Sequence, residues 1–198
     1  HFDEDLFNNC SDNVNLLGFF QSEKYFKNVE SDLRKDFTFR KEWLEPCLDF
    51  MSQFDNQEVV FLHVRRGDPN LVDKRGFKWA YVNIQDQHPV QPIDYYQKAL
   101  EHFPKDTPVL VFSDAIDWCK EQELFKSDRF LFSEPDDKYE DGALVPYVDL
   151  CLMSLCSHAI IANSSMSWWG AWLISNQNKK VIAPKLWFGP TYSNNNTK

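Results

Sequence analysis

Short apolar runs alternate along the chain with stretches in which apolar residues recur at helical spacing. The runs are rich in β-branched and aromatic residues, which is typical of strands buried on both faces of a sheet. They cover residues 16–20, 59–64, 108–114, 130–132, 158–162 and 180–183. The other stretches predict helices at about 22–36, 41–54, 92–103, 117–125, 145–156 and 165–175. Because strands and helices alternate, we expect an α/β fold with a mostly parallel sheet and helices on both faces.

Polar segments separate these elements. We expect loops at residues 1–15, 69–91 and 133–142, the last of them acidic. The segment 69–91 is long for a loop in a compact domain, and loops of that length tend to be functional or mobile. Its place after a candidate ligand site leaves two interpretations, a loop that covers substrate and an ordinary surface insertion.

The apolar run Val59–Val64 is the most informative part of the sequence. It is interrupted only by His63, and it ends in Arg65 and Arg66. Two guanidinium groups at the carboxyl end of a buried strand stand where open α/β sheets bind ligands. An arginine fork matches phosphate oxygens, so the implied ligand is an anion, most simply a diphosphate. The alternative is a surface pair of arginines neutralised by Asp68 and other carboxylates.

A second strand-to-helix junction has the chemistry of an anion site. Asn163, Ser164 and Ser165 come directly after the apolar run 158–162 and before a tryptophan-rich helical stretch. These residue types are favoured at helix amino termini. A helix start carries partial positive charge and unpaired N–H donors, so it binds phosphate readily. Routine capping, which needs only one such residue, is the alternative.

Composition narrows the class of protein. The 198 residues include 43% hydrophobic and 16% aromatic residues, as in an ordered globular protein. The net charge of −9 argues against a general nucleic-acid binder. No apolar run approaches the roughly 20 residues that span a bilayer. The five cysteines contain no CxxC pair, and Cys151 and Cys156 are expected to be buried free thiols. This pattern favours a reducing compartment such as the cytoplasm. A parent protein in the Golgi, or one tethered to another membrane, is the alternative.

Common nucleotide, hydrolase and metal motifs are absent. The sequence has no GxGxxG, no GxxxxGK[ST] and no GxSxG. Neither the cysteines nor the histidines have zinc-ligand spacing. The acidic triplet Asp3-Glu4-Asp5 is of a kind that can hold a divalent metal, but no strand precedes it. We therefore predict no metal site.

The informative segments together resemble the α-1,2-fucosyltransferase family, glycosyltransferase family 11. They are Leu17–Phe26, His63–Asp68, Phe112–Asp114 with Trp118, Ile160–Trp172, and Val181–Pro184 with Trp187 and Phe188. They occur in the family's order over nearly the whole chain. The resemblance implies a two-domain GT-B enzyme whose donor-binding half is Rossmann-like. It also implies transfer of L-fucose from GDP-fucose to a glycan hydroxyl, on galactose in an α-1,2 linkage, with inversion and with no cofactor.

By resemblance, the two junctions bind the diphosphate of the donor. Arg65 is assigned to the β-phosphate, and Arg66 orients the site or reaches the fucose. Ser164 and Ser165 are expected to donate to the same phosphate. Further residues of the matching segments complete the predicted donor site. These are Ser113, Asp114, Asn163 and Ser167.

The resemblance also implies residues for the base and for the acceptor. A histidine of the arginine motif and an aspartate in the later helix hold guanosine in related enzymes, and here these are His63 and Asp149. His63 has an alternative interpretation as a core histidine with its hydrogen bonds satisfied. Asp68 is the candidate general base for the acceptor hydroxyl, and an ion pair with a neighbouring arginine is its alternative role.

The sequence departs from the family pattern in places. Ala115 and Met166 stand where many members have aspartate and phenylalanine. The family's opening glycine-rich segment would precede His1, so we expect one part of a larger or processed protein. Residues 1–40 are then a remnant or linker toward an acceptor-side domain, and residues 41–198 the domain that binds the GDP-sugar. A transferase with another nucleotide-sugar donor and a non-catalytic nucleotide-binding module are the alternative functions.

Overall fold

The computed structural model describes residues 2–18, 20, 22–67, 86–134, 139–140, 143–144 and 146–191, with the backbone alone for 139–140 and 143–144. The chain divides into two compact units, residues 1–38 and a larger unit that begins at Phe39. This boundary lies close to the division expected at residue 40. The roles assigned to the two parts stay predictions.

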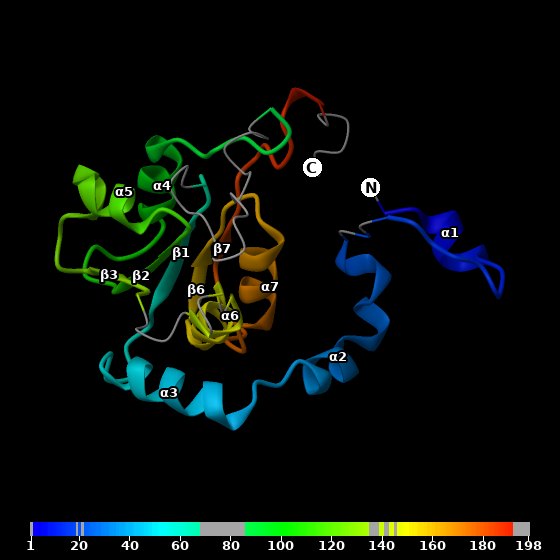
Figure 1. The fold of residues 1–198 in the computed structure, drawn as a ribbon, viewed down its shortest axis with the longest axis horizontal. Helices are drawn as coiled ribbons and strands as arrows, with labels where there is room; N and C mark the ends of the chain where they lie inside the picture. Colours follow the sequence, from blue (N-terminus) through cyan, green and yellow to red (C-terminus); the bar gives the residue numbers. More distant parts are fainter. Residues whose placement is uncertain are drawn as a thin grey trace. The chain divides into compact units, whose positions relative to one another are not determined.

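A five-stranded parallel sheet forms the centre of the larger unit (Figure 1). Its strands are β1 (Val60–Val64), β2 (Val109–Ser113), β3 (Phe130–Phe132), β6 (His158–Ile160) and β7 (Val181–Ile182). Their order in the sheet is β3-β2-β1-β6-β7, so β1 is the central strand. All residues of β1 are buried. The sequence-based expectation of a parallel α/β sheet is confirmed.

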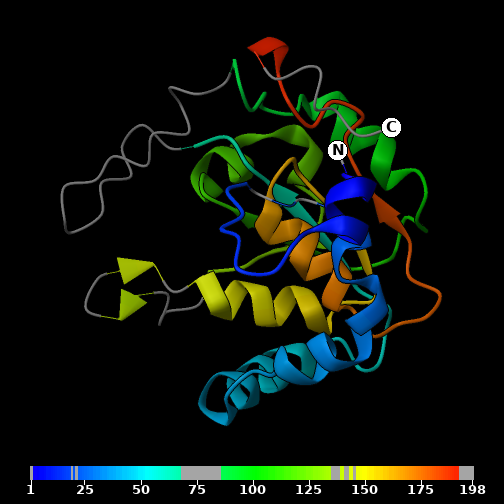
Figure 2. The ribbon, with the colours of Figure 1, turned by 90° about the vertical axis from the view of Figure 1, so that its right-hand side faces the viewer.

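Helices precede or follow the strands in the described residues of the larger unit. They are α3 (Lys41–Ser52), α4 (Ile93–Leu100), α5 (Ile116–Glu121), α6 (Pro146–Leu155), α7 (Ser165–Leu173) and the 3-10 helix Glu123–Phe125. A short antiparallel pair, β4 (Tyr139–Glu140) and β5 (Ala143–Leu144), precedes α6. Figure 2 shows α6 running alongside α3, with which it packs.

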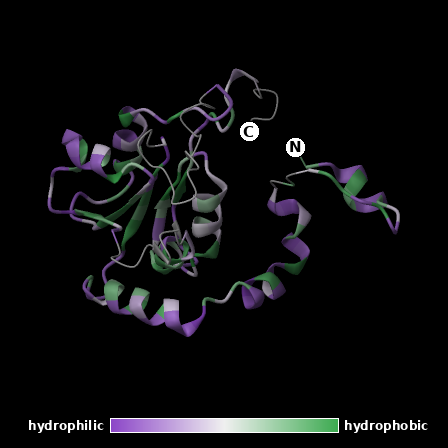
Figure 3. Cartoon of the chain, in the orientation of Figure 1, coloured by the Kyte–Doolittle hydropathy of each residue, from purple (hydrophilic) through white to green (hydrophobic). Residues whose placement is uncertain are grey.

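Two hydrophobic cores lie on opposite faces of the sheet, because side chains alternate along a strand. Phe61 belongs to a core that includes buried residues of α3, α6 and α7. Its neighbour Leu62 belongs to a core that includes buried residues of α4 and α5. The hydrophobic colouring of the strands in Figure 3 follows from this arrangement. Helices therefore cover both faces, as expected.

The chain order places a topological switch point between β1 and β6. From β1 the chain moves outward through β2 to β3, and it then returns to β6 on the other side of β1 and continues to β7. The helix that follows β1, α4, packs on one face, whereas the helix that follows β6, α7, packs on the other. In open α/β sheets, ligands bind outside the carboxyl ends of the strands at such a point.

Residues 4–9 contradict the expectation of a loop at the amino end. They form α1 (Glu4–Asn9), whose first turn holds Glu4 and Asp5. The Asp3 carboxylate accepts a hydrogen bond from the Leu6 N–H at 2.9 Å and caps the helix. A capping aspartate and acidic residues near the helix start stabilise a short helix that has little apolar periodicity.

Two other expectations for the first unit need correction. Residues 16–18 and 20 are not in a strand, and Phe20 has a φ of 47°, which a strand does not accommodate. Residues 23–29 form the 3-10 helices Glu23–Tyr25 and Lys27–Val29 before α2 (Glu30–Asp36) begins. The predicted end of this helical segment at Asp36 is confirmed.

The predicted acidic loop at 133–142 also contains secondary structure. Tyr139 and Glu140 of β4 pair with Leu144 and Ala143 of β5. An antiparallel pair this short needs only local hydrogen bonds, and two residues are too few to give a periodic pattern in the sequence.

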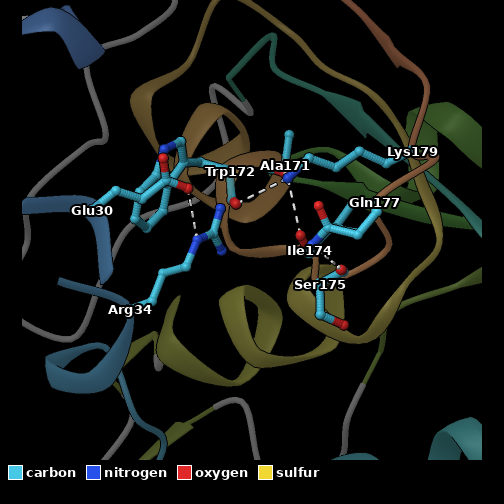
Figure 4. Close-up of polar contacts among 8 residues, drawn as sticks. All are labelled: Glu30, Arg34, Ala171, Trp172, Ile174, Ser175, Gln177 and Lys179. Atoms are coloured by element: carbon cyan, nitrogen blue, oxygen red, sulfur yellow. Dashed lines mark hydrogen bonds and ion pairs between the residues drawn. The ribbon is translucent and has the colours of Figure 1, made fainter. Parts of the chain in front are cut away.

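Lys179 caps the carboxyl end of α7. Its Nζ donates hydrogen bonds to the carbonyl oxygens of Ala171, Trp172 and Ile174 at 2.9, 3.0 and 2.9 Å (Figure 4). The last carbonyls of a helix have no partner within the helix, so one ammonium group here supplies the donors that they lack. Figure 4 also draws the Glu30–Arg34 ion pair, which joins successive turns of α2 within the first unit.

We predict that Lys179→Met lowers the free energy of unfolding by about 1–3 kcal/mol, because carbonyls of three buried residues lose a charged donor. Urea denaturation followed by circular dichroism measures this change. Lys98→Met is the matched control, since Lys98 forms an exposed ion pair with Asp94 on the surface of α4. Equal midpoints for the two variants would contradict the capping role.

Candidate functional site

The turn after β1 is held by the carboxylate of Asp114, which follows the neighbouring strand β2. Asp114 Oδ2 accepts from Arg65 Nη1 at 2.6 Å and from the Gly67 N–H at 2.9 Å, and Oδ1 accepts from the Arg66 N–H at 3.1 Å. Gly67 has a φ of 76°, in the region that glycine adopts without strain. The carboxylate therefore fixes both the backbone of the turn and the guanidinium of Arg65.

The side chains of the two arginines contact different partners. The Arg65 side chain is 23% exposed and that of Asp114 is 11% exposed, so their ion pair is partly shielded from water. The Arg66 guanidinium lies 3.7 Å from the centre of the Trp118 ring on α5, in a cation–π contact. Among the described residues Asp114 pairs with Arg65, whereas Asp68, the candidate general base and possible arginine partner, lies outside them.

His63 is a neutral, buried group directly beneath the arginine turn. It is 5% exposed, and burial, with a further contribution from the charge of Arg65, lowers the pKa of His63 to about 3. Within the described residues, its Nδ1 atom is buried and has no hydrogen-bond partner. A core histidine retained for packing would have this nitrogen satisfied. The predicted contact of His63 with a nucleotide stays a prediction.

At the second junction, Asn163 ties two distant loops to the end of β6. Its Nδ2 donates to the carbonyl oxygens of Pro89 at 3.0 Å and Trp187 at 3.1 Å. The residue is 3% exposed, and in the described part of the chain its Oδ1 is buried without a partner. Asn163 holds the walls of the site in place and leaves one acceptor unused.

The serines of this junction differ in their environments. Ser164 is the N-cap of α7, and its side chain makes no capping hydrogen bond. Ser165 is exposed at the first helical position. Ser167 is fully buried, and its hydroxyl donates to the carbonyl oxygens of Ala162 and Ser164 at 3.4 and 3.2 Å. The hydroxyl of Ser167 thus supports the start of α7, and its predicted contact with the donor stays a prediction.

Ser113 has a local role at the end of β2. Its hydroxyl accepts a hydrogen bond from the Ala115 N–H at 2.9 Å. This bond turns the chain into α5 and places Asp114 over the β1 turn. Ser113 thus positions a neighbour, and its predicted contact with the donor stays a prediction.

The register of the sheet brings the two junctions together. Leu62 of β1 pairs with Ile160 of β6. Continuing this register beyond the ladder places Arg65 beside Asn163, one strand spacing of about 4.8 Å away. The arginine turn and the amino terminus of α7 are therefore neighbours at the carboxyl edge of the sheet, as the sequence predicted.

His88 is a site residue that the sequence reasoning missed, because it lies in a segment predicted to be a loop. Burial and the charge of Arg65 both lower the pKa of His88. Its ring centre is 5.5 Å from that of Phe188, and the Gly189 N–H donates to the Gln87 carbonyl at 2.8 Å. The one signal in the sequence was Phe188, which lies in a segment that resembles the family.

Asp149 lies at the start of α6, next to the end of β3. The Ser133 hydroxyl donates to Asp149 Oδ1 at 2.8 Å. A hollow of about 200 Å³ lies between α3 and α6 near this pair. It is lined by Trp43, Cys47, Phe50, Ser133, Val148 and Leu152, among others. The lining thus joins residues of both helices to Ser133, the partner of Asp149.

The described residues offer no obvious metal site and no membrane-spanning helix. No group of three acidic, histidine or cysteine side chains is arranged there to hold a metal ion. Asp3, the first residue of the acidic triplet, caps α1 instead. None of the helices in this part of the chain combines the length and the apolar character that crossing a bilayer requires.

Comparison with protein families gives a match over residues 2–196 to the model of glycosyl transferase family 11. The chain belongs to this family. The parallel sheet with helices on both faces agrees with a Rossmann-like glycosyltransferase fold. The resemblance noted from the arginine and serine motifs is therefore confirmed at the level of the family.

Individual relatives show which proteins the chain resembles. The O-antigen biosynthesis glycosyltransferase WbnK of Escherichia coli is 28% identical over 98% of this chain. An alpha-1,2-colitosyltransferase of the same organism is 34% identical over 88% of the chain, and human galactoside alpha-(1,2)-fucosyltransferase 1 is 24% identical over 81%. The alignments cover 62%, 56% and 43% of these relatives, so the chain spans about half of their length.

The low pKa of His63 makes the free energy of unfolding of the chain depend on pH. Its pKa is about 3 in the folded chain against 6.5 ordinarily, so the unfolded state binds more protons between these values. We predict that stability falls as the pH drops below 6.5, with a slope that approaches about 1.4 kcal/mol per pH unit for this residue. Urea titrations at pH 7.5, 6.5 and 5.5 measure the slope. The variant His63→Leu should have a smaller slope of stability against pH, whereas His102→Gln, at an exposed histidine, should keep the slope of the unmodified chain. Equal slopes in the unmodified chain and both variants would refute the role of His63.

The Asp114 carboxylate supports the arginine turn, so its removal should affect both stability and binding. We predict that Asp114→Asn costs about 1–3 kcal/mol of unfolding free energy, because Arg65 loses its anionic partner. We expect binding of GDP, the nucleotide that the family resemblance implies, to weaken as well, because the turn is no longer fixed. Thermal melts and calorimetry measure the two effects, with the exposed Asp94→Asn as control. A normal melting temperature with weakened binding would instead assign Asp114 to direct ligand contact.

Proposed function

We propose that the larger unit binds the nucleoside diphosphate of a sugar donor, GDP-fucose in the first instance, and that the protein transfers the sugar to a glycan hydroxyl. The observation that carries the proposal is the Arg65 guanidinium, fixed by Asp114 at the end of β1 beside the amino terminus of α7. Family membership supports a sugar transfer reaction, and the names of the relatives support an α-1,2 linkage.

Charge explains why a diphosphate suits this place. Arg65 supplies a fixed positive charge, and the start of α7 adds backbone N–H donors and the positive end of the helix dipole. When the bond between sugar and phosphate breaks, its electron pair goes to the phosphate. Fixed positive groups at that oxygen stabilise the transition state more than the bound substrate. Arg65 and the N–H donors at the start of α7 would thereby stabilise the leaving phosphate. We therefore propose that no metal ion is needed.

We assign the base of the nucleotide to the end of the site away from the diphosphate. His63 presents an unpaired nitrogen, and Asp149 lies with Ser133 beside the hollow between α3 and α6. The edge of guanine carries an N–H and an amino group that a carboxylate can accept. We propose that Asp149 accepts from this edge and that His63 orients the nucleoside.

The acceptor hydroxyl needs a base on the face of the sugar opposite to the leaving phosphate. In an inverting step, the acceptor oxygen bonds to the anomeric carbon as the phosphate leaves, and its proton passes to that base. Asp68, proposed from the family resemblance, lies outside the described residues. His88 is a second candidate, because a pKa lowered by burial and by Arg65 keeps its imidazole neutral and able to accept a proton.

The sugar itself has two candidates. The relative with 34% identity is named for colitose, whereas the galactoside fucosyltransferase is 24% identical. Colitose lacks one hydroxyl of fucose, and a site built to hydrogen-bond that hydroxyl discriminates strongly between the two sugars. Parallel assays with GDP-fucose and GDP-colitose identify the donor, since the better substrate should have the higher kcat/KM.

The function is tested by transfer from GDP-fucose to a galactoside acceptor, followed by mass spectrometry of the product. We predict transfer that persists in EDTA. Arg65→Ala should lower it at least about tenfold, because a charge-assisted contact to phosphate contributes a few kcal/mol. Arg40→Ala, at an exposed arginine, is the control.

The outcomes separate the candidate functions. Binding of GDP without transfer by the unmodified chain, with either donor, would favour a non-catalytic nucleotide-binding module. Transfer that vanishes in EDTA and returns with manganese or magnesium would refute metal independence. Normal activity of Arg65→Ala would remove the phosphate assignment on which the proposal depends.

Base recognition is tested by comparing GDP with UDP. We predict that GDP binds about tenfold more tightly or better, because polar groups left unpaired by the wrong base cost roughly 1–3 kcal/mol each. Asp149→Ala should narrow this difference, whereas Arg65→Ala should weaken both nucleotides alike. Calorimetry measures the affinities, and Asp49→Ala on the exposed side of α3 is the control. A lower melting temperature with unchanged selectivity would mean that Asp149 only holds Ser133.

A further inference from the structure

The Arg66 guanidinium is stacked on an aromatic ring, beside the ion pair of Arg65 and Asp114. Its central carbon lies 3.7 Å from the centre of the Trp118 ring on α5. In the other contacts between a cation and a ring among the described residues, the charged group lies 5.2 to 5.8 Å from the ring centre. Of these contacts, only that of Arg66 is close enough for the flat guanidinium to lie against the face of the ring.

Arg66 is held at two points by the segment that joins β2 to α5. Its backbone N–H donates to Asp114 Oδ1 at 3.1 Å, and its guanidinium lies on Trp118, which follows on the first turn of α5. The Gln122 side-chain amide donates to the Trp118 carbonyl at 2.9 Å. The indole is half-buried and packs against the core that includes buried residues of α4 and α5. Trp118 is therefore fixed by its own contacts within the fold.

The two arginines differ in how their charge is balanced. Arg65 Nη1 donates to the Asp114 carboxylate at 2.6 Å, so much of the charge of Arg65 is offset and part of its donor edge is occupied. In the described part of the chain, no carboxylate pairs with the Arg66 guanidinium, and its support is a neutral ring. A ring contacts the flat face of a guanidinium and leaves the N–H groups in its plane available. Arg66 therefore keeps both its charge and its donors for an anion.

The place of Arg66 suits an anionic ligand. The residue comes directly after β1 and Arg65, and α7 begins after the neighbouring strand β6. A diphosphate carries more negative charge than one paired arginine can balance. Stacking also restricts a long side chain before the ligand binds, so less conformational entropy is lost on binding. The contact with Trp118 thus prepares the second arginine for the diphosphate.

We propose that Trp118 is a positioning residue for binding of the sugar donor. Its indole face holds the Arg66 guanidinium beside the pair of Arg65 and Asp114, and Arg66 thereby contributes the uncompensated positive charge that meets the diphosphate. Trp118 acts through Arg66 and does not contact the ligand. The inference rests on the proposed function, because it assigns a further part of the same site.

The stack is tested first in the free chain, without a ligand. NMR spectroscopy of the ¹⁵N-labelled chain records the Arg66 Nε–H resonance, which a ring beneath the guanidinium shifts upfield. We expect this shift in the unmodified chain, its loss in Trp118→Leu and its retention in Phe130→Leu. Phe130 is the matched control, because its ring contacts Arg129 and packs against the same core. An Arg66 resonance at one position in the unmodified chain and in Trp118→Leu would overturn the proposal.

Calorimetry with GDP and with inorganic pyrophosphate then tests what the stack does. We expect Trp118→Leu to weaken the binding of both ligands about fivefold, and Trp118→Tyr, which keeps a ring, to recover most of the affinity. Arg66→Ala should weaken both ligands more than Trp118→Leu does, because it removes the charge itself. Phe130→Leu should lower the melting temperature as Trp118→Leu does and leave both affinities unchanged.

The outcomes separate this inference from the proposed function. Affinities that are unchanged in Trp118→Leu, or that fall equally in Phe130→Leu, would overturn the role of Trp118 and leave the donor site in place. If Trp118→Leu does not fold, the Arg66 resonance of the unmodified chain and the affinities of Trp118→Tyr and Arg66→Ala decide. An unmodified chain that binds neither GDP nor pyrophosphate, with the Arg66 resonance still shifted, would instead refute the proposed function.

Discussion

The Asp114 carboxylate joins two neighbouring strand ends, and the candidate site depends on that junction. It accepts hydrogen bonds from two backbone N–H groups of the arginine turn and from the Arg65 guanidinium. The contact needs β1 and β2 to be parallel neighbours, because only then do their carboxyl ends meet. An arginine so fixed needs little reorganisation when negative charge arrives, which is the condition for effective electrostatic stabilisation. The anion site is thus a consequence of how the sheet is assembled.

Asn163 has the corresponding function at the end of β6. One amide group binds the carbonyls of Pro89 and Trp187, so segments distant in the sequence are held beside the start of α7. Hydrogen bonds of this kind hold the groups around a binding site in place without contacting the ligand. The same division holds for Ser113 and Ser167, whose hydroxyls bind the backbone. Residues of one motif therefore separate into those that can meet a ligand and those that support them.

Much of the fold follows from the sequence because β1, β2 and β6 are buried apolar runs. Their pattern has no competing interpretation, and the helices between them are long enough to have a clear period. The first unit was harder to predict. Its helix α1 depends on a cap by Asp3, and residues 16–18 and 20 are apolar in part but pair with no strand among the described residues. In the site, Arg65 and Ser164 were predicted from local chemistry, and their contacts with a ligand stay predictions. His88 and the bond between Ser133 and Asp149 depend on tertiary contacts that no local pattern encodes.

The central claim is that the ends of β1 and β6 form one diphosphate site. Its most direct test is a titration of the ¹⁵N-labelled chain with GDP, in which the backbone and arginine side-chain N–H resonances are monitored by NMR spectroscopy. The account predicts that Arg66, Gly67, Ser165 and the Arg65 side chain shift together, with one dissociation constant, while residues of α4 on the far face stay unchanged. Shifts confined to one junction, or centred away from both, would contradict it.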